Sequence, residues 1–237
     1  MKKIVNFISF IALCLMVTGC GTDNYDAPTS ILQGQILYNG NPIGLRGSSS
    51  IVNNEIIPAI ELQLYQDGYE LHNSIRVTVD QEGKFRSKLF DGQYKMVTKD
   101  KNGPWVNSRD TIIVNVKGNT IQNVPVTPFF IVNNDAITMS ADSLVTFTGT
   151  IEKIDPTAVL GSVTLYIGDT QFTDNLYNVA NVVVANSKIT TYPYTLSETM
   201  NLKGDKKVLA SKHLYGRICV KTTGTTEGIF SKVFKLK

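Results

Sequence analysis

The chain has 237 residues, enough for one or two domains, and its 42% of hydrophobic and 18% of charged residues exclude an intrinsically disordered protein. Its formal net charge is +3, but two of its 23 basic residues lie in a segment that we expect to be removed, which leaves 21 against 20 acidic residues. This near-neutral balance gives no support for nucleic acid as a partner.

Residues 1–19 are expected to form a signal peptide. A basic start precedes an apolar run from Ile4 to Val17, which is shorter than the about 20 residues that a membrane-spanning helix needs. The exit Val17-Thr18-Gly19-Cys20 resembles the lipobox of bacterial lipoproteins. This resemblance implies a thioether-linked diacylglycerol on Cys20, and two or more acyl chains give stable anchoring. The alternative is an ordinary secretory signal followed by a chance cysteine.

A lipid on Cys20 makes the outer membrane the first expected partner. Residues 20–30 are polar and would then form a lipidated tether. Acidic and amide residues follow the lipid site at Asp23, Asn24 and Asp26, and in some lipoproteins such residues direct export to the cell surface. We therefore expect a lipid-anchored protein at the cell surface, with the periplasmic face of the membrane as the alternative.

Residues 31–128 carry the alternation of apolar and polar residues that is typical of antiparallel strands with one buried face. Ile60, Leu62 and Leu64 show this alternation clearly. Five dipeptides suited to tight turns separate the short strands: Asn39-Gly40, Asp67-Gly68, Glu82-Gly83, Asp91-Gly92 and Asn102-Gly103. Short strands at this spacing predict a β-sandwich domain.

A domain boundary is expected near residues 126–130, because Pro125 and Pro128 cannot donate hydrogen bonds within a central sheet. The alternation then resumes and predicts a second β-sandwich over residues 129–237. Residues 179–185 suit either a strand or one turn of helix, and their valines favour a strand. The expected fold class is therefore all-β, with two β-sandwich domains after the signal peptide.

Cys219 is the only cysteine left once Cys14 is removed with the signal and Cys20 carries lipid. No internal disulfide is therefore expected in the mature chain. The neighbours Ile218 and Val220 indicate a strand at this position. We expect Cys219 to be a buried, unreactive thiol.

Several motifs of the first domain combine turn glycines with apolar residues that return to the core. They are Leu32-x-Gly34-x-Ile36, Asn39-Gly40-x-Pro42-Ile43, Ile60-x-Leu62-x-Leu64-Tyr65, Asp80-x-x-Gly83-x-Phe85 and Gly92-x-Tyr94. In this pattern the domain resembles the transthyretin-like, carboxypeptidase-regulatory-like sandwich family. The resemblance implies a prealbumin-like fold for the first domain and is almost silent on function. The second domain has the length common in immunoglobulin-like and fibronectin III-like modules.

Features spread over the mature chain carry a second resemblance. They are Tyr25-Asp26-Ala27-Pro28, Asp110-Thr111, Pro128-Phe129-Phe130 and Leu214-Tyr215-Gly216-Arg217. The chain is similar to a family of uncharacterised two-domain lipoproteins from glycan-degrading Gram-negative gut commensals. Such proteins tend to be encoded beside outer-membrane glycan importers of the starch-utilisation-system type. The resemblance implies glycan binding or an assembly role at the cell surface, with the importer proteins as partners, and no established activity.

Groups that could carry catalysis are scarce. The two histidines, His72 and His213, have no second ligand at metal-site spacing, and the sequence lacks H-E-x-x-H, G-x-S-x-G and phosphate-loop patterns. We therefore expect no enzyme, no zinc site and no cofactor. A glycoside hydrolase stays open as a second alternative, because it needs only two converging carboxylates. The available carboxylates are Glu61, Glu70, Asp80, Asp91 and Asp110.

A calcium site is an alternative interpretation of the polar segment 168–175. Asp169 and Asp174 lie there together with amide side chains, and such oxygens are ligands for hard cations. The segment lacks the spacing of a known calcium loop. A turn that is capped by these side chains is therefore the favoured interpretation.

Sugar binding needs exposed aromatic rings, which pack on the apolar faces of pyranoses, together with polar groups that orient the sugar. Trp105 is the only tryptophan, and it follows Asn102-Gly103-Pro104 in an expected loop, with Asn107 and Arg109 beside it. This makes Trp105, Asn107 and Arg109 the first candidate glycan-binding residues. Further candidates in the second domain are Tyr177, Tyr192 and Tyr194.

The sequence thus leaves functions of different classes open. The first is a non-catalytic surface lipoprotein that binds oligosaccharide or supports a glycan importer. The alternative is a structural or protein-interaction lipoprotein for adhesion or assembly, without a glycan ligand, which would use exposed sheet edges. A cluster of exposed aromatic residues around one groove would favour the first, and a broad apolar patch without a pocket would favour the alternative.

Overall fold

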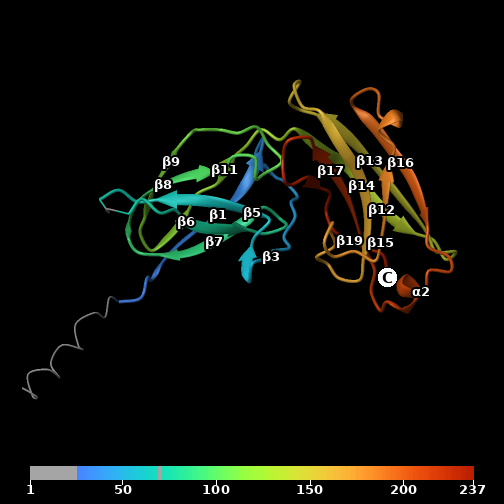
Figure 1. The fold of residues 1–237 in the computed structure, drawn as a ribbon, viewed down its shortest axis with the longest axis horizontal. Helices are drawn as coiled ribbons and strands as arrows, with labels where there is room; N and C mark the ends of the chain where they lie inside the picture. Colours follow the sequence, from blue (N-terminus) through green and yellow to red (C-terminus); the bar gives the residue numbers. More distant parts are fainter. Residues whose placement is uncertain (1–25, 69–70) are drawn as a thin grey trace, which may run out of the picture.

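Strands make up nearly all regular structure of residues 26–68 and 71–237, which the computed structural model describes. They form two domains that lie end to end (Figure 1). The expected all-β fold class with two domains is therefore confirmed. The expected signal peptide, the lipid site Cys20 and the carboxylate Glu70 lie outside the described residues. In the described parts of the chain, no helix is both long and apolar enough to cross a membrane.

The first domain is built on one mixed sheet whose main path runs β10-β1-β7-β6-β5-β8-β9, with β2 and β11 paired to β1. The sheet curls until β9 and β10, at its two ends, are in contact. Its strands are β1 (Ser30–Tyr38), β2 (Asn41–Pro42), β5 (Ile60–Tyr65), β6 (Ile75–Val79), β7 (Lys84–Leu89), β8 (Gly92–Thr98), β9 (Ile112–Val116), β10 (Asn119–Ile121) and β11 (Val124–Pro125).

The turn chemistry explains why these strands pair as they do. Asn39 and Gly40 have φ of 48° and 77°, which matches a two-residue hairpin turn between β1 and β2. Gly83, with φ of 74°, lies between β6 and β7. The turn prediction for Asn102-Gly103 is wrong in detail, because the positive φ of 58° falls on Lys101. The Asn102 amide instead fixes the start of β5, since it donates to Ala59 O at 2.7 Å and accepts from Glu61 N at 2.9 Å.

The second domain is a sandwich of two sheets. The smaller sheet has the order β12-β13-β16, and the larger has β15-β14-β17-β18 with β19 paired to β17. The strand favoured over residues 179–185 is confirmed as β15, whereas the short helix α2 was not expected; Asp205 caps it by accepting from Lys207 N and Val208 N. The elements are β12 (Phe130–Met139), β13 (Leu144–Lys153), β14 (Leu160–Gly168), β15 (Ala180–Val184), η1 (Asn186–Lys188), β16 (Tyr194–Asn201), α2 (Lys206–Ala210), β17 (Tyr215–Thr222), β18 (Ile229–Phe230) and β19 (Phe234–Lys235).

A separate hairpin projects from the segment that joins β2 to β5. It consists of β3 (Ser50–Val52) and β4 (Glu55–Ile57), and its turn residues Asn53 and Asn54 have φ of 52° and 63°. Figure 1 shows β3 beside the junction of the two domains. The hairpin carries exposed apolar side chains at Ile51, Val52 and Ile56.

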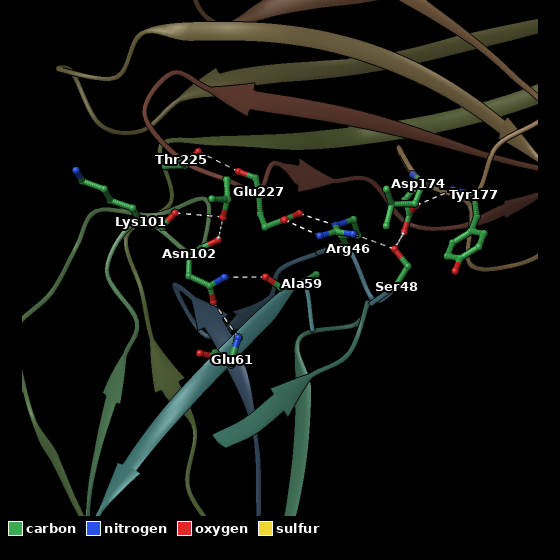
Figure 2. A network of polar contacts seen from close by, with 12 residues as sticks. Arg46, Ser48, Ala59, Glu61, Lys101, Asn102, Asp174, Tyr177, Thr225 and Glu227 are labelled. Carbon is green, nitrogen blue, oxygen red and sulfur yellow. Dashed lines mark hydrogen bonds and ion pairs between the residues drawn. The ribbon is translucent and has the colours of Figure 1, made fainter. Parts of the chain in front are cut away.

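A polar network fixes the two domains against each other (Figure 2). Arg46 of the first domain donates to both carboxylate oxygens of Glu227 at 2.7 Å, and Ser48 donates to Asp174. Thr226 closes the other end of the network, since its hydroxyl donates to Asn102 O at 3.1 Å. Buried apolar residues of both domains also belong to one continuous core. The junction is therefore a packed interface and not a free linker.

Cys219 in β17 is buried, as expected. Burial raises the pKa of its thiol to about 12, although the nearby Arg217 charge opposes this shift. We predict that a thiolate-selective reagent labels Cys219 at pH 8 about a thousandfold more slowly in the native protein than in denaturant, because a pKa of about 12 against an ordinary 9.0 leaves that much less thiolate. Rapid labelling of the native protein would contradict this burial.

Candidate functional site

A cleft of about 800 Å³ lies between the two domains. The β1–β2 hairpin and the turn at residues 81–84 form its wall on one side, and β12, β17 and the segment before β19 form the other. Amide side chains are concentrated in its lining: Gln35, Asn41, Gln81, Asn133, Asn134 and Gln171. Acidic and basic side chains also line the cleft. The cleft therefore presents many hydrogen-bond donors and acceptors of both kinds, within the size range of small-ligand sites.

One of these amides has an unused acceptor. Gln81 is 8% exposed, and its Nε2 donates to Glu82 Oε1 at 3.0 Å. Its Oε1 is buried and has no hydrogen-bond partner among the described residues. The opposite orientation of the amide would bring Oε1 against the Glu82 carboxylate, so the observed orientation is the favourable one. Leaving such an oxygen unpaired costs about 1–3 kcal/mol.

A β-bulge shapes the opposite wall. The pairing of β12 with β13 shifts between Asn133 and Ala136, so that Asn134 and Asp135 of β12 lie opposite the single residue Gly149 of β13. Asn134 takes φ of 50°, a conformation that asparagine tolerates better than most residues. Bulges of this kind re-aim side chains at functional sites. Here the bulge places Asn134 and Asp135 in the lining of the cleft.

Two residues form the floor of the cleft: Phe230 supplies an apolar ring, and Arg217 supplies a cation. The guanidinium lies 4.5 Å from the centre of the Phe230 ring and donates to Leu45 O at 2.9 Å and to Ser231 O at 3.2 Å. Burial lowers the pKa of Arg217 to about 10, against the opposing effect of nearby acidic groups. The half-buried Tyr215 completes this end of the cleft. An aromatic ring beside hydrogen-bonding groups is the combination that sugars require.

The cleft continues along the β1–β2 hairpin. A second depression of about 380 Å³ shares Asn41 and Val132 with it and adds Tyr38. A third, of about 800 Å³, shares Tyr38 and Asn39 with the second. We call the three together the junction groove. Its length along the hairpin suits an extended ligand better than a single small molecule.

The structure corrects the prediction for Trp105. The side chain is only 2% exposed, and its backbone bridges to Pro128. Its ring packs so closely on Gly103 that an added Cβ there would lie 2.1 Å from Cζ2. The expected exposed aromatic platform is therefore wrong, because the loop folds back against the junction and buries its largest apolar group. Asn107 and Arg109 are exposed and line the third depression, with Trp105 beneath them.

The three tyrosine candidates do not join that site. Tyr177 is exposed on the loop after β14. Tyr192 and Tyr194 are partly buried against the core, and the Tyr192 ring centre lies 5.5 Å from that of Phe130. Burial raises the pKa of Tyr192. Tyr192 and Tyr194 therefore pack in part on the core of the second domain, and neither of them lines the junction groove.

The calcium interpretation of Asp169 and Asp174 also fails. Asp174 Oδ1 accepts from Leu176 N at 2.8 Å and Tyr177 N at 3.0 Å, and Oδ2 accepts from Ser48. These bonds cap the loop and tie it to the first domain, which is the favoured capped turn. Asp169 is exposed, and no group of three or more His, Cys, Asp or Glu residues placed to hold a metal occurs in residues 26–68 and 71–237.

The carboxylates considered for glycoside hydrolysis serve structural roles where they are described. Glu61 is buried and pairs with Arg76 at 2.7 Å and Lys99 at 2.6 Å. Asp80 accepts from the backbone of its own turn, Asp91 from Ser30, and Asp110 from Ser108. Each of these four groups therefore has a local partner, and none of them lines the cleft. Asp80 lines a separate depression on the first domain, and Asp110 lines the third depression of the junction groove.

Sequence reasoning missed Gln81, Asn134, Tyr38 and Tyr215 as members of one site. They come from four segments that meet only when the domains pack. One local signal was present: the polar run Asn133-Asn134-Asp135 interrupts the apolar alternation of β12, as a bulge does. Gln81, inside the expected Asp80-Gly83 turn, carried no such signal.

Two family models cover nearly all of the described chain. The model of the DUF3823 N-terminal domain, a protein of unknown function, matches residues 30–127, and that of the DUF3823 C-terminal domain, also of unknown function, matches residues 130–235. The chain belongs to the DUF3823 family. The resemblance to a two-domain family of uncharacterised proteins from gut commensals is thereby confirmed.

Solved structures agree with this assignment. A DUF3823 protein from Parabacteroides merdae is 36% identical with a TM-score of 0.79, over 90% of this chain and 100% of that one. A DUF3823 protein from Bacteroides ovatus is 30% identical with a TM-score of 0.75, over 87% and 98%. A Bacteroides uniformis protein described as a "putative carbohydrate binding protein" is 18% identical with a TM-score of 0.69, over 89% and 99%, and shares the fold. No curated protein matches the chain.

Proposed function

We propose that this protein is a non-catalytic, lipid-anchored surface protein that binds oligosaccharide in the junction groove, as part of a polysaccharide-uptake system. The observation that carries the proposal is the cleft between the two domains, in whose lining amide side chains are concentrated. A sugar hydroxyl both donates and accepts a hydrogen bond, so it can pair with the oxygen of one amide and the N–H of another. The description of the Bacteroides uniformis relative as carbohydrate binding supports the same function.

The rest of the groove fits this ligand. Half-buried Tyr38 and Tyr215 supply aromatic surface at two separate places in it. Five basic and four acidic side chains line the whole groove: Lys84, Arg109, Arg217, Lys232 and Lys235 against Glu82, Asp110, Asp135 and Glu152. This near balance gives no strong single-sign field over the groove as a whole, so the groove favours a neutral oligosaccharide over a highly charged one. Lipid on Cys20 would hold the groove at the cell surface, where it could pass glycan to an importer protein.

We predict that Gln81→Met weakens glycan binding about 3- to 10-fold without lowering stability. Methionine keeps the length of the side chain but removes its amide from the lining of the cleft, and the loss of one hydrogen bond to a ligand costs about 0.5–1.5 kcal/mol. In the free protein the change removes an unpaired buried oxygen. The measurement is the dissociation constant of the soluble mature chain for a glycan identified by affinity electrophoresis on a polysaccharide panel, beside its free energy of unfolding.

The matched control is Gln93→Met, since Gln93 is exposed on β8 and outside the groove. A second variant, Asn134→Gly, removes another groove amide at a positive φ that glycine accepts, with Asn53→Gly in the β3–β4 turn as its control. Equal binding by all four variants would contradict the groove as the site. Absence of binding to every glycan would favour the protein-interaction alternative, with the exposed β3–β4 hairpin as the surface to test against importer proteins.

A further inference from the structure

The first domain has one end at which the chain enters from the tether. Ser30, the first residue of β1, donates its hydroxyl to Asp91 in the β7–β8 turn and accepts from Gly118 N at 2.7 Å in the β9–β10 turn. Asp26 and Ala27 line a shallow depression together with Phe90 of the β7–β8 turn. The last part of the tether is therefore bound to this end of the domain, which we call the tether end.

Exposed apolar side chains gather at the tether end. Phe90 is 50% exposed in the β7–β8 turn, and Leu71 is 76% exposed in the segment between β5 and β6. The sheet order places these segments together: β6 and β5 lie between β7 and β8, so the turn from β7 to β8 passes the end where β5 finishes and β6 begins. Ile75, at the start of β6, is also exposed. Phe90 and Leu71 thus project from the same end of the domain.

The length of the tether limits where this end can lie. Only six peptide steps separate Cys20 from Asp26, and an extended chain covers at most about 3.6 Å for each, or about 20 Å in all. A lipid on Cys20 would therefore keep the tether end within about 20 Å of the headgroups. The second domain lies at the opposite end of the molecule (Figure 1). The cleft of the junction groove lies between it and the first domain.

We propose that the tether end rests on the lipid bilayer, with Phe90 and Leu71 inserted at the boundary between headgroups and acyl chains. This inference rests on lipidation of Cys20 and is independent of glycan binding. Aromatic and aliphatic side chains gain free energy on entering that boundary. The second contact gives the lipid anchor a fixed orientation. It holds the first domain upright, so that the junction groove faces away from the membrane.

The charge at the tether end favours insertion of apolar side chains as the membrane contact, rather than attraction to anionic lipid. Lys88 and Lys117 are exposed there, but Asp26 and Asp91 lie beside them, and Lys95 is paired with Asp67 at 2.7 Å. Among the described residues of this end the positive and negative groups therefore nearly balance, so these residues form no polybasic patch for anionic lipid. We expect the contact to form equally on neutral and anionic bilayers.

The buried Cys219 makes a direct test practical, since a reagent at neutral pH would not label it and the Cys20 thiol would be occupied by lipid. The full chain is expressed with its lipid in a Gram-negative host and carries Phe90→Cys, Leu71→Cys or, as control, Val183→Cys on exposed β15 of the second domain. Each cysteine is labelled with an environment-sensitive fluorophore. The proteins are then reconstituted in neutral phosphatidylcholine vesicles with and without spin-labelled quencher lipid.

We expect the labels at positions 90 and 71 to shift to shorter wavelength and to lose about half of their emission to the quencher lipid, as groups at the headgroup boundary do. The label at 183 should do neither. Emission at 90 and 71 that matches 183 would overturn the proposal. The mass of the mature chain tests lipidation separately, and an unlipidated chain would remove the premise. Glycan binding measured on the same samples is a separate readout, so failure of the groove and failure of this contact are distinguished.

Discussion

Replacing Glu227 by alanine is expected to lower the free energy of unfolding by about 3–5 kcal/mol, because it leaves the Arg46 guanidinium buried without its partner. The two side chains are 7% and 10% exposed and form two parallel hydrogen bonds of 2.7 Å. Burial alone would lower the pKa of Arg46, but the hydrogen bond and charge of Glu227 raise it above its ordinary value. Arg46 therefore stays charged. It cannot avoid the cost of an unpaired buried charge by releasing a proton.

Equilibrium denaturation by guanidinium measures this change in the free energy of unfolding. Two control variants allow it to be interpreted. Glu198→Ala breaks an ion pair of similar length, 2.6 Å to Lys188, in which the lysine is 55% exposed, so it should cost less than about 1 kcal/mol. The double variant Arg46→Met/Glu227→Leu removes both charges and should recover most of the lost stability. A Glu227→Ala cost as small as that of Glu198→Ala would show that the junction pair is solvated in solution.

The position of this pair gives the prediction a functional consequence. Arg46 and Glu227 join the first domain to the segment before β18, and the adjacent Phe230 N donates to Gly44 O at 2.9 Å. Both walls of the junction groove depend on that contact. We therefore expect any variant that separates the domains to lose glycan binding, even when all groove side chains are intact.

Sequence patterns predicted the strands and failed at the packing between domains. The alternation through Leu62 and Leu64 indicated a half-buried strand correctly, because that signal is local and has a period of two. Glu61, between Ile60 and Leu62, was expected to face solvent but is buried, and it pairs with Arg76 of β6 and with Lys99 just after β8. Local alternation does not contain such cross-strand pairs.

The candidate site shows this limit of prediction from local sequence patterns more strongly. Gln81 and Asn134 are 53 residues apart in the sequence and line opposite walls of one cleft. No propensity or spacing rule brings them together, since their proximity depends on the relative placement of two domains. Trp105 was mistaken for an exposed residue for the same reason, because a neighbouring proline and glycine indicate a loop but not what the loop packs against.

Trp105→Ala is accordingly expected to destabilise the protein by about 3–5 kcal/mol, the cost of a large cavity in a packed core. The indole belongs to the continuous core, and the backbone around it is fixed by bonds from Val106 N to Thr127 O at 2.9 Å and from Phe129 N to Pro104 O at 3.1 Å. Loss of glycan binding in this variant would therefore report unfolding or a collapsed groove floor, and not the loss of a stacking platform.

Circular dichroism is the suitable probe of this unfolding, because Trp105 is the only tryptophan and the variant has no indole fluorescence. Val106→Ala is the matched control: the neighbouring side chain is 39% exposed, so its truncation should cost under about 1 kcal/mol. If Trp105→Ala retained full stability and still lost binding, the indole would have to contact the ligand directly, and the buried position of its ring would be wrong. Joint loss of stability and binding, with both retained in Val106→Ala, makes Trp105 the support beneath Asn107 and Arg109 in the groove.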